Sequence, residues 1–150
     1  MAHYSQYSEA ENRALDLWVK LARTYSVFNK HAIAHIRSTG LTPTQFAVVE
    51  CLGHRGKMTL GELSEKMLMS CGNITLVVQN LEKECLVERI RSNTDRRVVH
   101  VDLSSEGRQR FAAVFPEHAA HIQALASVLS VEEQSTLAGL LKKLGLSIRD

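Results

Sequence analysis

The chain has few residues that interrupt helices: its 150 residues include only two prolines and eight glycines. Because a fold of many strands needs frequent turns, this shortage favours long helices. Aromatic residues are also scarce, at 5% of the chain. No apolar run approaches the roughly 18 residues that a membrane-spanning helix needs, and residues 1–10 are too polar for a secretion signal. We therefore expect a cytoplasmic protein without membrane association.

The three cysteines are odd in number and irregularly spaced. This pattern argues against a disulfide framework and fits a reducing compartment. The net charge is only +2, so overall charge does not indicate a nucleic-acid partner, and any basic footprint must be local. The length suits a single domain, 1–150, with its own core. The sequence carries none of the common nucleotide, zinc-protease or dithiol motifs, and we expect neither an enzyme nor a cofactor.

Amphipathic helices are predicted at both ends of the chain. Apolar residues recur at helical spacing over 9–39, and a helix of that length spans roughly 45 Å. Because a domain of this size cannot cover such a helix, its apolar excess is predicted to pack against a partner subunit. A second helical pattern covers 105–128, with Pro116 as a predicted bend, and a last helix follows the capping box that begins at Ser130.

Three shorter helices are predicted in the middle of the chain, over 43–54, 60–67 and 71–84. Each begins after a residue suited to cap a helix, namely Thr42, Thr59 or Ser70. Only three residues separate the second of these helices from the third. Two short helices joined by so short a turn predict a helix-turn-helix.

The pattern then changes to the alternation of strands. Residues 88–91 are predicted as a strand with Ile90 inward and Arg89 and Arg91 outward, and 99–103 as its hairpin partner. The intervening residues 92–97 form a polar, basic tip. A helix-turn-helix followed by a hairpin is a winged helix, here over 42–104. The fold class is therefore mainly α with a small β-hairpin, flanked by helices at both ends.

A winged helix suits DNA, because its second helix enters the major groove and reads base edges with its N-terminal residues. That helix begins with small polar side chains, and the hairpin carries four arginines that suit phosphates or a narrow minor groove. Asp95 is placed to hold an arginine by a charge-assisted pair. The predicted DNA-binding residues are Ser70, Cys71, Gly72, Asn73, Thr75, Gln79, Arg89, Arg91, Asp95, Arg96 and Arg97.

Several ordered motifs resemble those of the MarR family of bacterial winged-helix regulators. The matching segments are 41–46, 59–64, 72–75, 80–83, 95–97 and 101–104. The stretch 72–83, together with 115–118 and 140–145, resembles the branch of that family that includes quinone- and hydroquinone-responsive repressors.

This resemblance implies a homodimer whose first and last helices, about 9–39 and 105–146, intertwine and whose two winged helices bind a pseudo-palindromic operator. It also implies a repressor that a small phenolic or quinone-like effector releases. The effector crevice of the family lies between the dimerisation helices and the winged helix. Residues of this chain that match its lining are Trp18, Tyr25, Phe28, His35, Phe46 and Phe111.

Thiol oxidation is an alternative way in which DNA binding could be regulated. Cys71 opens the recognition helix, where the helix dipole favours a thiolate, and oxidation there would weaken DNA binding. Cys85 stands where the family usually has glycine in a left-handed turn, so it is either a tolerated substitution or a reactive thiol. Cys51 is predicted to lie in the core.

Two histidine pairs, His31 with His35 and His118 with His121, share helix faces as metal ligands do, although we expect interface or surface roles and no metal. A winged helix that binds protein rather than DNA, and activation rather than repression, are further alternatives.

Overall fold

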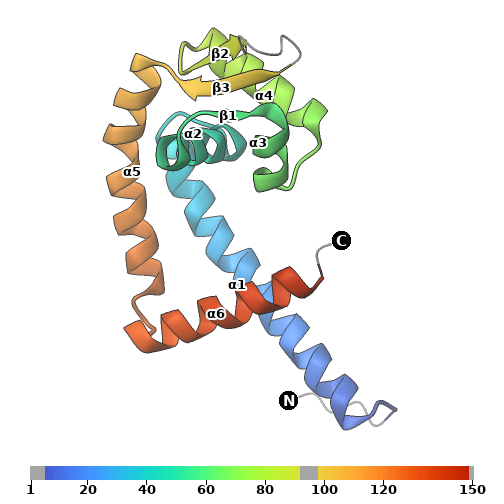
Figure 1. Cartoon of the computed structure of the whole chain (residues 1–150). Helices are drawn as coiled ribbons and strands as arrows, with labels where there is room; N and C mark the ends of the chain where they lie inside the picture. The colour runs from blue at the N-terminus through green and yellow to red at the C-terminus, as the bar shows by residue number, and fades with distance from the viewer. Residues whose placement is uncertain (1–5, 92–97, 149–150) are drawn as a thin grey trace.

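The computed structural model describes residues 6–91 and 98–148, and it has the predicted mainly helical architecture with a small sheet (Figure 1). The elements in chain order are α1 (Glu9–Ser38), α2 (Pro43–Arg55), β1 (Met58–Thr59), α3 (Leu60–Met67), α4 (Cys71–Lys83), β2 (Val87–Arg91), β3 (Val99–Leu103), α5 (Ser105–Ala126) and α6 (Val131–Ser147).

The helix starts are fixed by local hydrogen bonds, as predicted. The Thr42 and Thr59 side chains each accept from a backbone N–H one turn into the helix, and the residue there, Gln45 or Glu62, bonds back to the cap's own N–H. These bonds also lower the pKa of the Glu62 carboxyl, because the Thr59 backbone N–H donates to its ionised form. Ser70 caps α4 by accepting from the N–H of Asn73. Local sequence therefore sets where the winged helix begins each of its helices.

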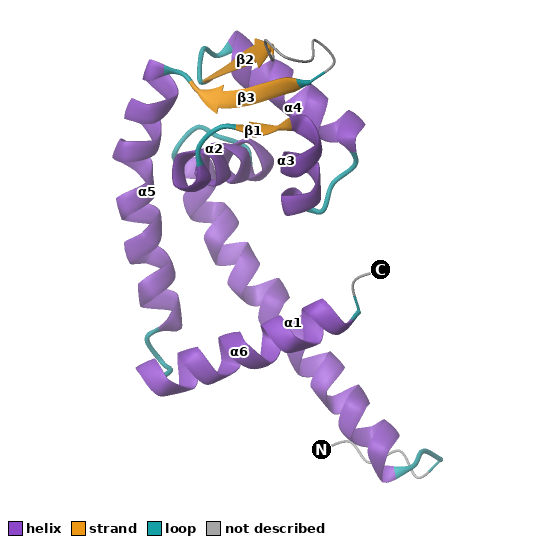
Figure 2. Ribbon diagram, viewed as in Figure 1, coloured by secondary structure: helices purple, strands orange, loops and turns teal. Residues whose placement is uncertain are grey.

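The sheet is antiparallel, with strand order β1-β3-β2 (Figure 2). Its inner face and helices α2, α3 and α4 enclose the main core. Strand β1 was not predicted from the sequence; it is only two residues long and pairs Met58 with Val101. The buried members of this core are Val48, Val49, Leu52, Met58, Leu63, Ile74, Val78, Leu81, Val87, Val101 and Leu103.

In strand β2, the residues that face the core differ from those predicted. Ile90 was expected to face inward, but it is 37% exposed and pairs with His100. Buried Val87 begins the strand, and alternation then places Arg89, which pairs with Val101, on the same face as Val87. The expectation that Ile90 faces inward is therefore wrong, because it left out the buried residue that sets the register, whereas Arg89 and Arg91 are exposed as expected.

A tight contact joins the end of α4 to the start of α5. Cys85 adopts the left-handed conformation, with φ of 57°, as expected for a position that favours glycine. Its carbonyl accepts a hydrogen bond from the Ser104 hydroxyl. Gly107 lies against the next carbonyl so closely that a Cβ there would be 1.9 Å from the oxygen of Leu86. The turn before β2 is thus fixed to the helix that leaves the winged region.

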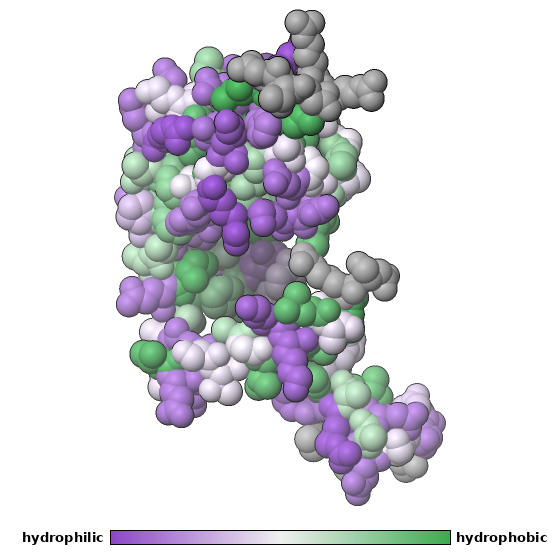
Figure 3. Space-filling model, viewed as in Figure 1, coloured by the Kyte–Doolittle hydropathy of each residue, from purple (hydrophilic) through white to green (hydrophobic). Residues whose placement is uncertain are grey.

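The long helices extend away from the winged helix. α5 packs along α1, while the other end of α1 reaches well beyond the sheet (Figure 1). Every residue of α6 is exposed. Large apolar side chains on α1 also lie in solvent, with Trp18 64% and Tyr25 67% exposed. Figure 3 shows apolar side chains on the visible surface of this part of the molecule. None of the described helices is long and apolar enough to cross a membrane.

Candidate nucleic-acid interface

Helix α4 has one buried face and one open face. Ile74, Val78 and Leu81 are fully buried against the core, which fixes the rotation of the helix about its axis. The opposite side of α4 therefore points to solvent along its whole length. A helix held in this way presents its first turns to a groove of DNA.

Most of the α4 residues that were predicted to contact DNA are exposed, as the sequence pattern indicated. Ser70, Cys71, Gly72, Asn73 and Gln79 are exposed, and Thr75 is half-buried. The Thr75 hydroxyl donates to the Cys71 carbonyl at 2.7 Å, so its proton is used within the helix. The Cys71 sulfur lies 3.2 Å from the hydroxyl oxygen of Ser64, which connects the first turn of α4 to α3.

Three further exposed residues on the same face were not predicted from the sequence. Leu76, Asn80 and Lys83 all lie on the solvent side of α4, and Leu76 is 59% exposed. Leu76 follows Gly72 by four residues, Asn80 follows Leu76 by four and Lys83 follows Gln79 by four, and this helical spacing is the signal that would have found them.

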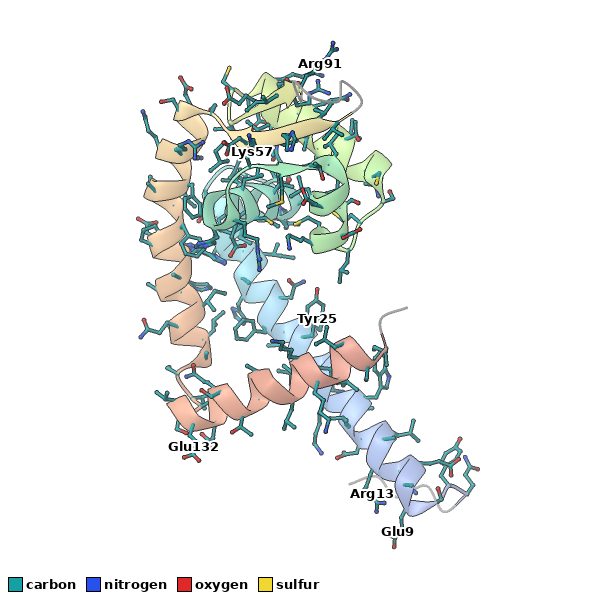
Figure 4. The ribbon with its side chains drawn as sticks, in the orientation of Figure 1. Glu9, Arg13, Tyr25, Lys57, Arg91 and Glu132 are labelled. Atoms are coloured by element: carbon teal, nitrogen blue, oxygen red, sulfur yellow. The ribbon has the colours of Figure 1, made fainter. Side chains whose placement is uncertain are left out.

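The arginines of the hairpin have different surroundings. Arg89 donates from Nε to Glu82 of α4 at 2.9 Å and from Nη2 at 2.5 Å, so it connects β2 to the recognition helix. These hydrogen bonds raise the pKa of the Arg89 guanidinium. Arg91 is exposed at the end of β2, at the upper edge of the molecule in Figure 4. The predicted contacts Asp95, Arg96 and Arg97 lie outside the described residues.

The six residues predicted to line an effector crevice lie in three different places in the structure. His35, Phe46 and Phe111 belong to a group of neighbouring rings between α1, α2 and α5. Phe28 lines a separate groove of about 480 Å³ with Leu125 of α5. Trp18 and Tyr25 lie further along α1 with most of their surface exposed (Tyr25 in Figure 4).

We call that group of rings the histidine–phenylalanine cluster. His35 stacks on His121 with ring centroids 4.8 Å apart and on His118 at 5.5 Å. His118 in turn lies 4.6 Å from the ring of Phe46. The chain of contacts continues through Phe115. The members of the cluster are His35, Phe46, His54, Phe111, Phe115, His118 and His121.

Two ring nitrogens of the cluster are buried without a hydrogen-bond partner in the part of the chain that the structure describes: Nε2 of His35 and Nδ1 of His118. Burial, together with the neighbouring His35 and His121, lowers the pKa of His118. The neutral form of the His118 imidazole is therefore favoured. Across residues 6–91 and 98–148, no group of three or more His, Cys, Asp or Glu side chains is arranged to hold a metal ion.

A second cleft, of about 590 Å³, opens between α2 and α3. Its lining includes Glu50 and Cys51, and burial raises the pKa of both side chains. Cys51 is half-buried against the core, close to its predicted place. Cys71 and Cys85 are exposed free thiols.

A helix-turn-helix with its inner side packed in the core, an open outer face on its second helix and an adjoining β-hairpin together define a winged-helix DNA-binding protein. The sequence profile of the MarR family matches residues 41–99. The chain is also 40% identical over 137 residues to the HTH-type transcriptional regulator MhqR of Bacillus subtilis (strain 168), covering 91% of this chain and 94% of that one. The protein therefore belongs to the MarR family of transcriptional regulators.

Solved structures share this fold. NadR in complex with 4-hydroxyphenylacetate superposes with a TM-score of 0.74 at 21% identity, covering 96% of this chain and 97% of that one. Streptococcus pneumoniae FabT in complex with DNA superposes with a TM-score of 0.69 at 23% identity, covering 88% and 96%. At these identities the two structures establish the shared architecture.

Proposed function

We propose that the protein is a homodimeric repressor that binds a pseudo-palindromic operator and is released by a small phenolic or quinone-like effector. The observation that carries this proposal is the open face of α4, whose exposed Ser70, Gly72, Asn73 and Gln79 lie opposite a fully buried face. In FabT, a protein of the same fold was solved bound to DNA.

Within this proposal, the hairpin arginines have separate roles. Exposed Arg91, together with Arg96 and Arg97 of the tip, contacts phosphate or a minor groove. Arg89, already paired with Glu82, holds the hairpin against α4 and so positions it. Asp95 orients one of the tip arginines.

The uncovered apolar side chains of α1 and α6 support a dimer. A monomer would leave them all in water, whereas a second copy would bury them. These residues are Leu15, Leu17, Trp18, Tyr25, Val27, Leu137, Leu140, Leu141 and Leu144.

The effector is proposed to bind between α1, α2 and α5, beside the histidine–phenylalanine cluster. His35 and Phe111 are half-buried rings, buried Phe46 packs against His118, and the buried Nε2 of His35 lacks the hydrogen-bond partner that an effector hydroxyl would supply. Phe28, Trp18 and Tyr25 lie along α1 and would complete the site at the dimer interface. The complex of NadR with 4-hydroxyphenylacetate shows that a relative in fold accepts a phenol.

One observation favours a second release mechanism. The Cys71 thiol is exposed, opens the recognition helix and lies 3.2 Å from Ser64. Its oxidation would place a bulkier polar group on the DNA-facing turn. Cys85, also exposed, is the other thiol through which an oxidant would act.

The test is release of a fluorescent duplex from the promoter region of the protein's own gene. Methylhydroquinone, benzoquinone and 4-hydroxyphenylacetate are titrated against the complexes of the wild-type protein and of a triple Cys→Ser variant, both with a metal chelator present. If the same hydroquinone or phenol releases the duplex from both proteins, the result supports an effector site. If only the quinone acts, and it releases the duplex from the wild-type protein alone, thiol chemistry is responsible. No release by any of them contradicts the proposed effector class.

A further inference from the structure

Leu76 occupies the centre of the outward face of α4. It follows Gly72 by four residues and precedes Gln79 by three, so the three share one side of the helix. The buried residues Ile74 and Val78 lie on the opposite side. At 59% exposure, Leu76 is a large apolar side chain in the middle of a face that is otherwise small or polar.

The surroundings of Leu76 leave its side chain free to meet a ligand. One turn earlier, Gly72 has no side chain, and a Cβ there would meet no atom of the described residues within 4 Å. The backbone can therefore approach a base pair closely at that turn, which brings the next turn near the groove floor. The adjacent Thr75 hydroxyl already donates to the Cys71 carbonyl, so its proton is not available to a ligand beside Leu76.

The bulkiest apolar group on the floor of the major groove is the C5-methyl of thymine. Apart from small C–H groups such as the cytosine C5–H, the other groups there are hydrogen-bond donors or acceptors, which a leucine would desolvate without replacing the hydrogen bonds to water. We propose that Leu76 is a specificity-determining residue that reads a thymine methyl group in each half-site of the operator. This inference rests on the proposed DNA-binding function of α4.

The experiment compares thymine with deoxyuridine, which differs only by the absent methyl. A duplex is first selected from a random pool by the wild-type protein. Each thymine is then replaced by deoxyuridine, one symmetric pair of positions at a time, and the affinity is measured by fluorescence anisotropy. Removing one methyl is expected to weaken binding about fourfold per half-site, which corresponds to ~0.8 kcal/mol for a buried methylene-sized group.

The expected result is one pair of positions at which deoxyuridine lowers the DNA affinity of the wild-type protein. The same replacement should leave the DNA affinity of Leu76→Ala unchanged. Leu76→Met, which keeps an apolar side chain, should retain the preference for thymine. Leu68→Ala provides the matched control, because Leu68 is 75% exposed in the turn before α4 and should leave that preference as in the wild-type protein. An unchanged melting temperature confirms that each variant is folded.

Two results would overturn the inference alone. One is a selected site at which no replacement weakens the wild-type protein, and the other is full discrimination retained by Leu76→Ala. If the pool yields no enriched sequence, the proposed function itself is contradicted and the inference falls with it.

Discussion

At the scale of single residues, Gly107 shows how closely the winged region and α5 meet. A side chain there would overlap the Leu86 carbonyl, a backbone atom that cannot rotate away. We expect Gly107→Ala to lower the free energy of unfolding by ~1–3 kcal/mol, as overpacking does in other cores.

Urea denaturation measures this effect. Gly61→Ala is the matched control, because Gly61 lies exposed in a helix and its added Cβ would meet only Thr59 at 3.9 Å. That variant should be as stable as the wild-type protein or more stable, by up to ~1 kcal/mol. Equal stability of all three proteins would show that the turn before β2 is not constrained as described.

His118 predicts a pH dependence of stability. Burial, with His35 and His121 nearby, lowers its pKa in the folded chain below the ordinary value of 6.5. Below pH 6.5 the unfolded chain therefore binds more protons, and the free energy of unfolding falls as the pH is lowered. His118→Phe, which suits the ring of Phe46 beside it, should remove this contribution.

The measurement is urea unfolding at pH 7.5 and 5.5 for the wild-type protein and the variant. His31→Gln serves as the control, since His31 is exposed. The wild-type protein and the control should lose more stability than His118→Phe over this interval. An equal loss in all three would contradict a neutral, buried His118.

At the scale of elements, substitutions of the two arginines of β2 should have different effects on DNA binding and on stability. Arg91→Gln should reduce the slope of log K against log salt by about 0.9 for each phosphate that the side chain no longer neutralises, with the stability unchanged. Arg89→Gln should leave the slope nearly unchanged, because Glu82 already neutralises that charge. It should lower the free energy of unfolding by the ~0.2–1 kcal/mol typical of a partly exposed pair.

Anisotropy titrations across a range of salt concentrations and urea melts distinguish these outcomes. A larger drop in salt slope for Arg89→Gln than for Arg91→Gln would reverse the two roles.

The elements also show what sequence alone can predict. Helix starts at Thr42, Thr59 and Ser70 were predictable because capping depends on residues three apart. The two-residue strand β1 has too few positions to show alternation, and it exists only because β3 pairs with it. Ile90 was assigned to the wrong face because its register depends on Val87 and on the partner strand.

The candidate site also has features that the sequence could predict and features that it could not. The exposed face of α4 follows from its own periodicity, so the exposure of most of the residues proposed to contact DNA was predictable. The histidine–phenylalanine cluster was not, because His35, Phe46 and His118 come from three helices. The pairing of Arg89 with Glu82 likewise joins a strand to a helix, and no spacing rule indicates it.

At the scale of the whole molecule, α6 predicts the oligomeric state. Leu140 is 60% exposed on a helix with no buried residue among those the structure describes. In the proposed dimer, Leu140→Lys would place a charge in an apolar interface, so it should shift the protein towards monomer. Val128→Lys is the control, because Val128 is 87% exposed in the turn between α5 and α6.

Sedimentation equilibrium at micromolar protein concentration measures the shift. The wild-type protein and Val128→Lys should have twice the mass of the 16.7 kDa chain, and Leu140→Lys should approach the mass of one chain. A wild-type protein that sediments as a monomer would refute the dimer.

Above all, the whole molecule is proposed to bind a specific DNA sequence through α4 and the hairpin. Fluorescence anisotropy tests this with the promoter region of the protein's own gene and a scrambled duplex of equal composition, at two salt concentrations. We expect tighter binding to the promoter and a steep loss of affinity with salt. Absence of binding to either duplex at low salt would contradict DNA recognition and would favour a winged helix that binds protein.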